Sequence, residues 1–321
     1  MYCGICHQDV TSSQREQRTL LGYNGSVTDE RLGSVIPEGP EIRRSTDFLH
    51  KLLGAKAPGR IRLVNVSVIG GRYLEKPPEG LEAFNAYKLD EHITVEGVGC
   101  RGKFQYWDFH PGWTMWCTYG MSGQWSTQCT KHAALELVYR DESEGAYPGL
   151  SCVWFNDPRH FGTVKFLHDP DGVKTQAKLD SLGPDMLNDP PDETKFRREL
   201  LCKHGWTLAE VLMDQSVVCG VGNYVKAESL YKARLSPHRL VRDMSTVEFE
   251  TLRQSIIDVM QTSLNSGGAT ISTYRNPDGS EGEAQKRFAV YGNKVDPMGN
   301  PVIKEKTLDG RTTWWCPQVQ N

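Results

Sequence analysis

The spacing of apolar and polar positions changes character along the chain. After a polar beginning without a clear period, apolar residues recur at helical spacing over 39–54, which predicts an amphipathic helix. Short runs rich in Val, Ile, Phe, Trp and Tyr follow, separated by glycine-containing turns, and this pattern is typical of strands. We predict strands at 60–69, 92–99, 103–109, 113–119, 133–140, 152–156 and 163–167. Such a series favours a β-sandwich or barrel with one helix packed beside it.

The second half of the chain has a helical pattern. It follows a segment rich in Asp, Pro and Gly at 169–192, which we interpret as a linker. Two residue pairs have the capping-box spacing that begins helices, Thr207 with Glu210 and Ser245 with Glu248. Residues 275–316 return to short strand-like runs with glycine-rich turns, which predicts a terminal hairpin. The whole pattern indicates an α+β fold.

Composition narrows the class of protein. The chain has 321 residues, of which 38% are hydrophobic and 9% aromatic, enough for two or three domains with cores of their own. No apolar run is as long as the roughly 18 residues of a membrane span, and the first residues lack the apolar core of a secretory signal. Nine cysteines, an odd number, suit free thiols in a reducing compartment. We therefore expect an intracellular protein, in the nucleus if the source is eukaryotic and otherwise in the cytoplasm.

The formal net charge is −3, so the chain as a whole does not attract phosphate. A nucleic-acid partner would have to be held by a local basic patch, because binding depends on the charges near the phosphates rather than on the sum.

The first motif with candidate chemistry begins the predicted helix, Pro37-Glu38-Gly39-Pro40-Glu41-Ile42-Arg43-Arg44. A helix start explains it equally well, because proline and acidic residues suit the first turn. The motif also closely resembles the N-terminus of endonuclease VIII (Nei), and more loosely that of formamidopyrimidine-DNA glycosylase (Fpg). This resemblance implies that Pro37, as a terminal secondary amine, attacks the sugar C1′ of a damaged nucleotide and leaves a Schiff base. It gives Glu38 the role of acid/base and makes Glu41 a supporting carboxylate.

Two further motifs extend the resemblance across the predicted strands. Arg101-Gly102-Lys103-Phe104 is a basic turn, and the matching lysine of the family contacts phosphate beside the lesion, which implies that role for Lys103. The segments 120–123 and 156–162 are rich in turn-forming residues, and β-turns alone would explain them. They match loops of Fpg whose side chains fill the gap left by the everted base, a role that falls on Met121, Arg159 and Phe161. In these loops the chain is more similar to Fpg than to bacterial Nei.

The helical half carries Gly220-Val221-Gly222-Asn223, which a turn between two core helices would also explain. It resembles the helix–two-turn–helix of the family, in which glycines let the backbone approach phosphate and the helix N-terminus supplies free donors. Asn223 matches the phosphate-binding asparagine. Near the C-terminus the family has a zinc finger with two cysteine pairs, whereas this chain keeps only Cys316. One thiolate cannot hold a structural zinc, so the hairpin resembles the zincless finger of some members, with Arg311 as the phosphate-binding arginine.

These matches occur in the order of the family, and they imply five segments. They are an N-terminal extension at 1–36 that is absent from the active form, a catalytic β-sandwich domain at 37–168, a linker at 169–192, a helix–two-turn–helix domain at 193–270 and a zincless finger at 271–321. The implied activity is a DNA glycosylase and AP lyase of base-excision repair that removes oxidised bases, with pyrimidines favoured by the Nei-like start. The implied partner is damaged double-stranded DNA, with bubble or single-stranded DNA as further substrates, and the enzyme acts as a monomer without a cofactor or metal.

The position of the proline departs from the family pattern. Pro37 lies inside the chain, and an amide nitrogen has no nucleophilic lone pair. Translation from a non-standard codon at Ile36, proteolytic removal of 1–36, or a catalytically silent damaged-DNA-binding protein of the same fold would each account for it. The extension itself contains Cys3-Gly4-Ile5-Cys6-His7, whose spacing suits zinc, covalent haem or two ordinary cysteines. An unrelated β-sandwich metal protein that uses Cys3 and Cys6 is the remaining alternative.

Overall fold

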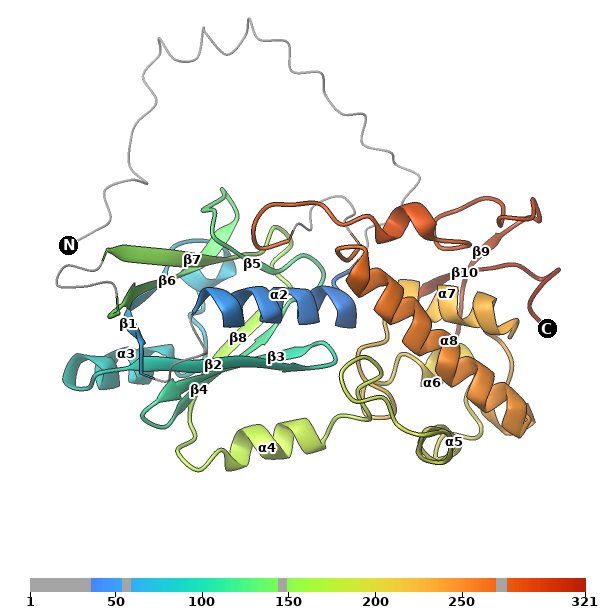
Figure 1. The fold of residues 1–321 in the computed structure, drawn as a ribbon, viewed down its shortest axis with the longest axis horizontal. Helices are drawn as coiled ribbons and strands as arrows, with labels where there is room; N and C mark the ends of the chain where they lie inside the picture. Colours follow the sequence, from blue (N-terminus) through green and yellow to red (C-terminus); the bar gives the residue numbers. More distant parts are fainter. Residues whose placement is uncertain (1–35, 54–58, 144–148, 270–275) are drawn as a thin grey trace, which may run out of the picture. The chain divides into compact units, whose positions relative to one another are not determined.

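The structure is a computed structural model that describes residues 36–53, 59–143, 149–269 and 276–321 (Figure 1). The extension with Cys3 and Cys6 lies outside the described residues, so the prediction for it stays a prediction. Among the described residues, no helix combines the length and the apolar character needed to cross a membrane.

The N-terminal half is an antiparallel sheet of eight strands in the order β5-β7-β6-β1-β2-β3-β4-β8. The strands are β1 (Ile61–Val68), β2 (Thr94–Arg101), β3 (Phe104–His110), β4 (Trp113–Thr118), β5 (Gln124–Ser126), β6 (Ala133–Asp141), β7 (Leu150–Asn156) and β8 (Thr163–His168). All seven predicted strands are present. The sequence did not predict β5, because a run of three residues is too short to show an alternating pattern.

Two parts of the sheet, β5-β7-β6-β1 and β2-β3-β4-β8, pack around one hydrophobic core. β1 pairs with β6 along its length but with β2 only through Ile61–Val95 and Arg62–Thr94, so the sheet can bend at this short join. Aromatic rings from both parts of the sheet meet in this core. The ring centroid of Trp107 in β3 lies 4.9 Å from that of Trp125 in β5, which lies 5.2 Å from that of Phe155 in β7. This is the predicted layered β architecture.

Two helices and a 3-10 turn accompany the sheet (Figure 1). The predicted helix is α2 (Gly39–Leu52), and it buries Ile42 and Leu49 against the core. The sequence did not predict α3 (Leu81–Asp90), because only Leu81 and Phe84 on it are buried and one turn gives no period. The 3-10 turn is η1 (Gly71–Leu74).

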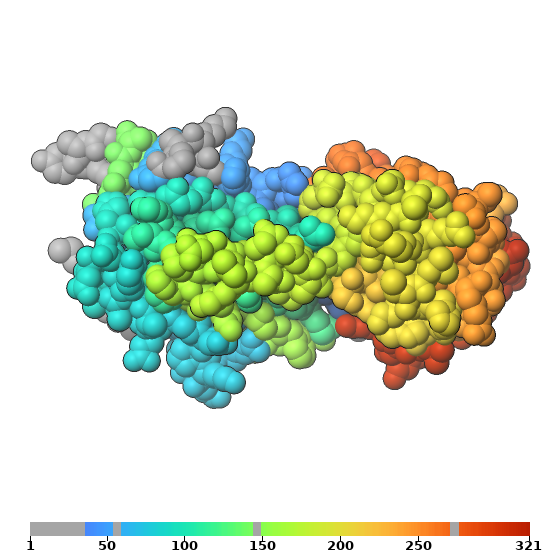
Figure 2. Space-filling view, turned by 90° about the horizontal axis from the view of Figure 1, so that it is seen from below, coloured from blue at the N-terminus to red at the C-terminus, as the bar shows by residue number. Residues whose placement is uncertain are grey.

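The segment 169–192, which the sequence predicts to be a linker, includes a helix that the sequence did not predict. It contains α4 (Val173–Asp180), whose start is held by Asp169, since this carboxylate accepts hydrogen bonds from the N–H groups of Lys174 and Thr175 at 2.9 Å. In Figure 2, α4 lies over the strands of the first half. The excess of Asp, Pro and Gly therefore marks the ends of a short helix.

The second half is helical and shares its core with the terminal hairpin. Its helices are α5 (Glu193–Leu201), α6 (Leu208–Val211), α7 (Asn223–Ala233) and α8 (Thr246–Asn265), with 3-10 turns η2 (Val241–Asp243) and η3 (Ala284–Arg287). Both predicted capping boxes are confirmed, at the starts of α6 and α8. The predicted terminal strands are confirmed only at β9 (Ile303–Lys306) and β10 (Thr312–Trp315), and Trp314 and Cys316 belong to the same hydrophobic cluster as Leu230 of α7.

Candidate active site

Glu38 joins the two halves of the chain. It stands at the N-cap of α2 and is 1% exposed. Its carboxylate accepts hydrogen bonds from the backbone N–H groups of Tyr224 at 2.9 Å and Val225 at 3.2 Å, both in the first turn of α7. These donors are free because a helix leaves its first N–H groups without intrahelical partners. The residue after Pro37 is therefore fixed at a helix N-terminus of the other half.

Glu41 is the second buried carboxylate, and it is fully enclosed. It accepts hydrogen bonds from the N–H of Glu38 at 2.9 Å, the N–H of Ala269 at 2.7 Å and the hydroxyl of Tyr224 at 3.1 Å. Ser263 of α8 donates to the same carboxylate at 3.3 Å. The carboxylate thus ties the start of α2 to α7 and to the end of α8, and the supporting role that the resemblance implies for it stays a prediction.

Glycines allow the two halves to approach this closely. The N–H of Gly39 donates to the carbonyl of Gly220 at 2.9 Å, and a Cβ on Gly222 would lie 2.3 Å from Cδ of Glu38. A Cβ on Gly102 would lie 2.6 Å from the nitrogen of Gly220. Any side chain at these positions would force the backbones apart, so the glycine-rich turn is needed for the site whether or not it also contacts phosphate.

Lys103 lies at the turn between β2 and β3, directly after Gly102. Burial lowers the pKa of Lys103, while the nearby Glu38 raises it and the positive charge of Arg311 lowers it. Burial raises the pKa of Glu38 to about 7, with the charge of Lys103 opposing that rise and Glu41 adding to it. Burial likewise raises the pKa of Glu41. A carboxyl that titrates near neutrality is suited to giving and taking protons at physiological pH.

Pro37 is buried immediately before Glu38, at the start of α2. The structure thus brings together Pro37, Glu38, Glu41 and Lys103 from two separate elements of the first half. The charge of Arg311 lowers the pKa of Lys103, so the finger arginine lies within electrostatic reach of this cluster.

Met121, Arg159 and Phe161 lie on two loops that are joined to each other. Ser122 donates to the carboxylate of Asp157 at 2.7 Å and accepts from the N–H of Arg159 at 3.0 Å. The guanidinium of Arg159 lies 5.8 Å from the ring centroid of Phe161, and that ring is 55% exposed. An exposed phenylalanine on a loop that is fixed at its base suits insertion between bases.

Asn223 begins α7, as predicted, but its amide donates to the carbonyl of Thr312 at 2.8 Å. This contact fixes the finger to the helix N-terminus one residue after Arg311, whose side chain is exposed. A second contact has the same effect: Lys226 of α7 and Asp309 of the β9–β10 loop form an ion pair of 2.5 Å, with side chains 0% and 3% exposed. The finger loop is therefore held on α7 at both sides of Arg311.

The finger does not fit a structural metal. Cys316 is buried, and its sulfur lies 3.5 Å from the amide oxygen of Gln318. Asp296, near the position of the absent first cysteine pair, accepts hydrogen bonds from the N–H groups of Met298 and Asn300 and from the hydroxyl of Tyr231. In the described part of the chain, no three His, Cys, Asp or Glu side chains are grouped so that they could hold a metal ion. Ring packing of Tyr291 on Trp314, at 4.5 Å, occurs in its place.

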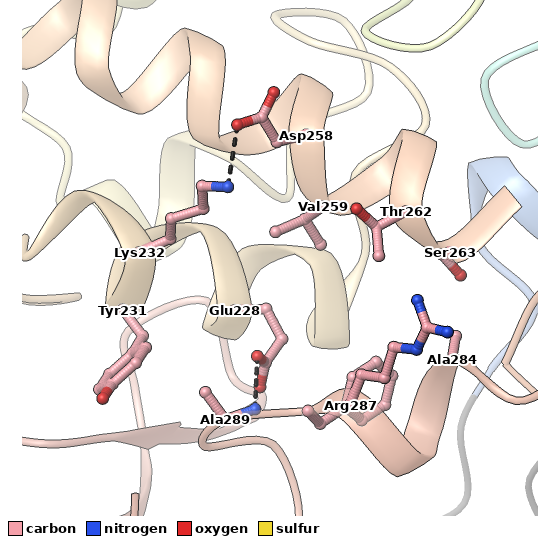
Figure 3. A pocket seen from close by; sticks show the side chains of 11 residues that line it. Glu228, Tyr231, Lys232, Asp258, Val259, Thr262, Ser263, Ala284, Arg287 and Ala289 are labelled. Carbon is pink, nitrogen blue, oxygen red and sulfur yellow. Dashed lines mark hydrogen bonds and ion pairs between the residues drawn. The ribbon is translucent and has the colours of Figure 1, made fainter. Parts of the chain in front are cut away.

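A cavity of about 290 Å³ lies behind the carboxylates, between α7, α8 and η3 (Figure 3). Its wall includes the ion pair Lys232–Asp258 and the Glu228 carboxylate, which accepts from the N–H of Ala289 at 2.7 Å. None of the predicted site residues lines this cavity, but Ser263, which donates to the Glu41 carboxylate, belongs to its wall.

Sequence reasoning missed four residues of the site. They are Tyr224, Ser263, Lys226 and Asp309. Tyr224 is adjacent to the predicted Asn223, so the motif itself was the available signal. The other three have no local pattern, because each contacts its partner across a long stretch of sequence.

Comparisons with known proteins match most of the described residues. Family models match residues 36–164 (formamidopyrimidine-DNA glycosylase N-terminal domain), 182–275 (its H2TH domain) and 280–321 (its C-terminal domain). A formamidopyrimidine-DNA glycosylase of Bradyrhizobium sp. is 30% identical over 246 residues, covering 71% of this chain and 83% of that protein.

Solved structures of formamidopyrimidine-DNA glycosylases have a similar fold. The Fpg (MutM) protein of Thermus thermophilus superposes with a TM-score of 0.73 at 29% identity, covering 88% of this chain and 98% of that one. A mutant of Lactococcus lactis Fpg in complex with a Fapy-dG containing DNA gives a TM-score of 0.73 at 25% identity, covering 89% and 100%.

Fold and matches define the class as a DNA glycosylase of base-excision repair. More specifically, the chain belongs to the formamidopyrimidine-DNA glycosylase (Fpg) family. An unrelated β-sandwich metal protein is thereby excluded, and the catalytically silent alternative is not favoured.

Proposed function

We propose that a form of this chain beginning at Pro37 excises oxidised bases from DNA and then cleaves the strand. The imino nitrogen of Pro37 bonds to C1′ of the damaged nucleotide and loses its proton, and the glycosidic bond breaks as the base leaves and takes up a proton. Glu38 gives its proton to the sugar oxygen as the ring opens, which leaves an iminium at C1′. The ionised Glu38 then takes a proton from C2′, a C2′–C3′ double bond forms, and the C3′–O bond breaks, so the phosphate on the 3′ side departs and the strand is cleaved.

The observation that carries this proposal is the burial and the raised pKa of Glu38. It is buried directly after Pro37 and has a pKa of about 7, so a proton is available at neutral pH next to the nitrogen that attacks. An exposed glutamate with an ordinary pKa would be almost fully ionised and a poor acid at the same pH.

The proposed partner is damaged double-stranded DNA, the kind of ligand that the Lactococcus lactis relative holds. Lys103, Asn223 and Arg311 contact phosphates around the lesion, and Met121, Arg159 and Phe161 fill the gap left by the everted base. Action as a monomer inside the cell is part of the same proposal. The Nei-like segment 37–44 favours oxidised pyrimidines, whereas the relatives are named for formamidopyrimidines. Excision rates measured for an oxidised pyrimidine and for a formamidopyrimidine, each placed in the same DNA sequence, distinguish these two preferences.

Borohydride trapping tests the chemistry. A 37–321 form with a free proline, incubated with an abasic duplex and sodium borohydride, should become covalently attached to DNA, and mass analysis should place the adduct on Pro37. The full chain with an intact Met1 is the matched control and should give no adduct at that residue. Binding without an adduct would mean that the protein is a silent DNA binder. N-terminal sequencing of the protein from its native source tests whether Pro37 becomes the terminus.

A further inference from the structure

A groove of about 440 Å³ lies on the face of β3, β4 and β8 that points away from the core, between η1 and α4. Strand register explains which side chains meet there. Phe104 pairs with Thr118, which pairs with Thr163, and Trp116 pairs with Lys165, so all five side chains point to one face. We call this feature the sheet groove.

The sheet groove combines cations with aromatic rings. Its lining includes Arg72, Lys76, Lys165 and Lys178, against the single carboxylate of Glu79. The ammonium group of Lys178 lies 5.7 Å from the ring centroid of Phe104, and that of Lys165 lies 6.0 Å from Trp116. Lys165 also pairs with Glu79 at 2.7 Å, whereas Lys76 and Lys178 form no ion pair with any residue that the structure describes.

The sheet groove begins where the proposed DNA contacts end. Phe104 directly follows Lys103. On the opposite side, the carbonyl of Gly162, next to Phe161, accepts hydrogen bonds from Arg72 and from the Tyr73 hydroxyl at 3.2 Å. The groove residue Phe104 thus adjoins the proposed phosphate contact Lys103, and the groove residue Arg72 contacts the loop that carries Phe161.

The volume restricts the occupant. A cavity of a few hundred cubic ångströms holds a ligand about the size of a nucleotide, and a duplex cannot enter it. Phe104 is buried, and Trp116 is the partly exposed ring of the groove. Cations beside such a ring are features by which proteins hold single-stranded DNA, since the cations neutralise phosphates and the ring stacks on a base. The overall charge of −3 does not oppose this, because the excess of cations is local.

We infer that the sheet groove binds a single-stranded DNA segment adjoining the lesion. The inference rests on the proposed function, because it extends the same DNA path. It gives the enzyme higher affinity for lesions beside a single-stranded stretch, such as a gap, a bubble or an unwound end.

Salt dependence gives the expected size of the effect. Each phosphate neutralised on a single strand contributes about −0.7 to the slope of log affinity against log salt. Two contacts, one each from Lys76 and Lys178, would make the advantage of a tailed substrate shrink about sevenfold between 50 and 200 mM salt.

The test measures binding of the full chain to a duplex that contains a tetrahydrofuran abasic analogue. One form is blunt, and others carry a single-stranded tail of the lesion strand on either side. The variant is Lys76→Glu/Lys178→Glu, and the matched control is Lys51→Glu/Lys195→Glu, which makes the same charge change at exposed positions of α2 and α5. Equal melting temperatures confirm that the variants are folded.

We expect one tail to tighten binding by the wild-type chain and the control, and the groove variant to lose that gain while it keeps its affinity for the blunt duplex. The inference is overturned if neither tail tightens binding, if the control loses the gain as well, or if the groove variant loses blunt and tailed duplex equally. A free single strand is measured in parallel. If no duplex is bound at all, the proposed function fails, and the loss or retention of single-strand binding in the groove variant still decides the role of the groove.

Discussion

The titration of Glu38 predicts a specific dependence of stability on pH. Its pKa is about 7 in the folded chain and 4.5 in its ordinary state. Because the folded pKa is the higher one, the stability associated with the protonated form is fully present below the ordinary pKa and is lost as the pH rises through 7. Between pH 5 and pH 8.5 this loss amounts to about 2–3 kcal/mol, since each pKa unit corresponds to about 1.4 kcal/mol.

Glu38→Gln removes this titration. The substitution also exchanges one hydrogen-bond acceptor at the start of α7 for a donor, which costs stability, but that cost does not vary with pH. The wild-type melting temperature should therefore fall by roughly 3–5 °C more than that of the variant between the two pH values, at about 1.5 °C per kcal/mol for a chain of 321 residues.

Thermal melts at pH 5 and 8.5 and equal ionic strength provide the measurement. Glu82→Gln, at an exposed position of α3, is the control and should follow the wild-type profile. If the melting temperatures of wild type and Glu38→Gln differ by the same amount at both pH values, Glu38 does not titrate in this range, and its assignment as the proton donor loses its physical basis.

Other predictions follow from the contacts around the site. Lys226→Met should destabilise the chain by about 3–5 kcal/mol in urea unfolding because it leaves the charge of Asp309 buried, and a Lys226→Met/Asp309→Leu double variant should recover most of that loss; equal stability of the single and double variants would contradict a buried pair. Gly222→Ala should lower kcat/KM by about a hundredfold because its Cβ would displace the catalytic carboxylate, whereas Gly205→Ala, with open space around it, should be neutral in the same assay. Phe161→Ala should leave stability within about 0.5 kcal/mol of wild type yet slow excision from duplex, and a parallel loss on single strands would argue against a wedge. Chelation with EDTA should leave the melting temperature unchanged, and a fall of several degrees would reveal a metal site beyond the described residues.

Local patterns were sufficient for the elements whose cause is local. The helix at 39–52, the capping boxes and the seven longer strands follow from periodicity and from residues a few positions apart. The helices α3 and α4 were missed because they bury one or two side chains each, which leaves no periodic signal. The predicted site residues came from short motifs that resemble those of the family. The structure groups Pro37, Glu38, Glu41 and Lys103, and it joins the loops of Met121, Arg159 and Phe161 to each other.

Contacts between distant segments could not be predicted in this way. The hydroxyl of Tyr224 reaches Glu41 across 183 positions of sequence, and Lys226 reaches Asp309 across 83. No propensity or spacing specifies such pairs, because the packing of the two halves creates them. The sequence placed a lysine in α7 and an aspartate in a turn, but only the fold shows that these two charges hold the finger arginine in position.

The acidity of the site is itself a product of that packing. Before the halves meet, Glu38 would stand at the solvated start of α2, where water stabilises the carboxylate and the pKa is ordinary. Docking against α7 has two opposing effects: the N–H groups of Tyr224 and Val225 stabilise the charge, and the removal of water destabilises it. The pKa of about 7 shows that the loss of water is the larger effect, even with Lys103 close by. Gly222 and Gly39 have no side chain and so allow α2 and α7 to approach closely. The burial of Glu38, and with it the raised pKa that keeps its proton available, depends on this close approach. A substitution that weakens the contact between the starts of α2 and α7 should therefore lower the pKa of Glu38 before it unfolds the chain.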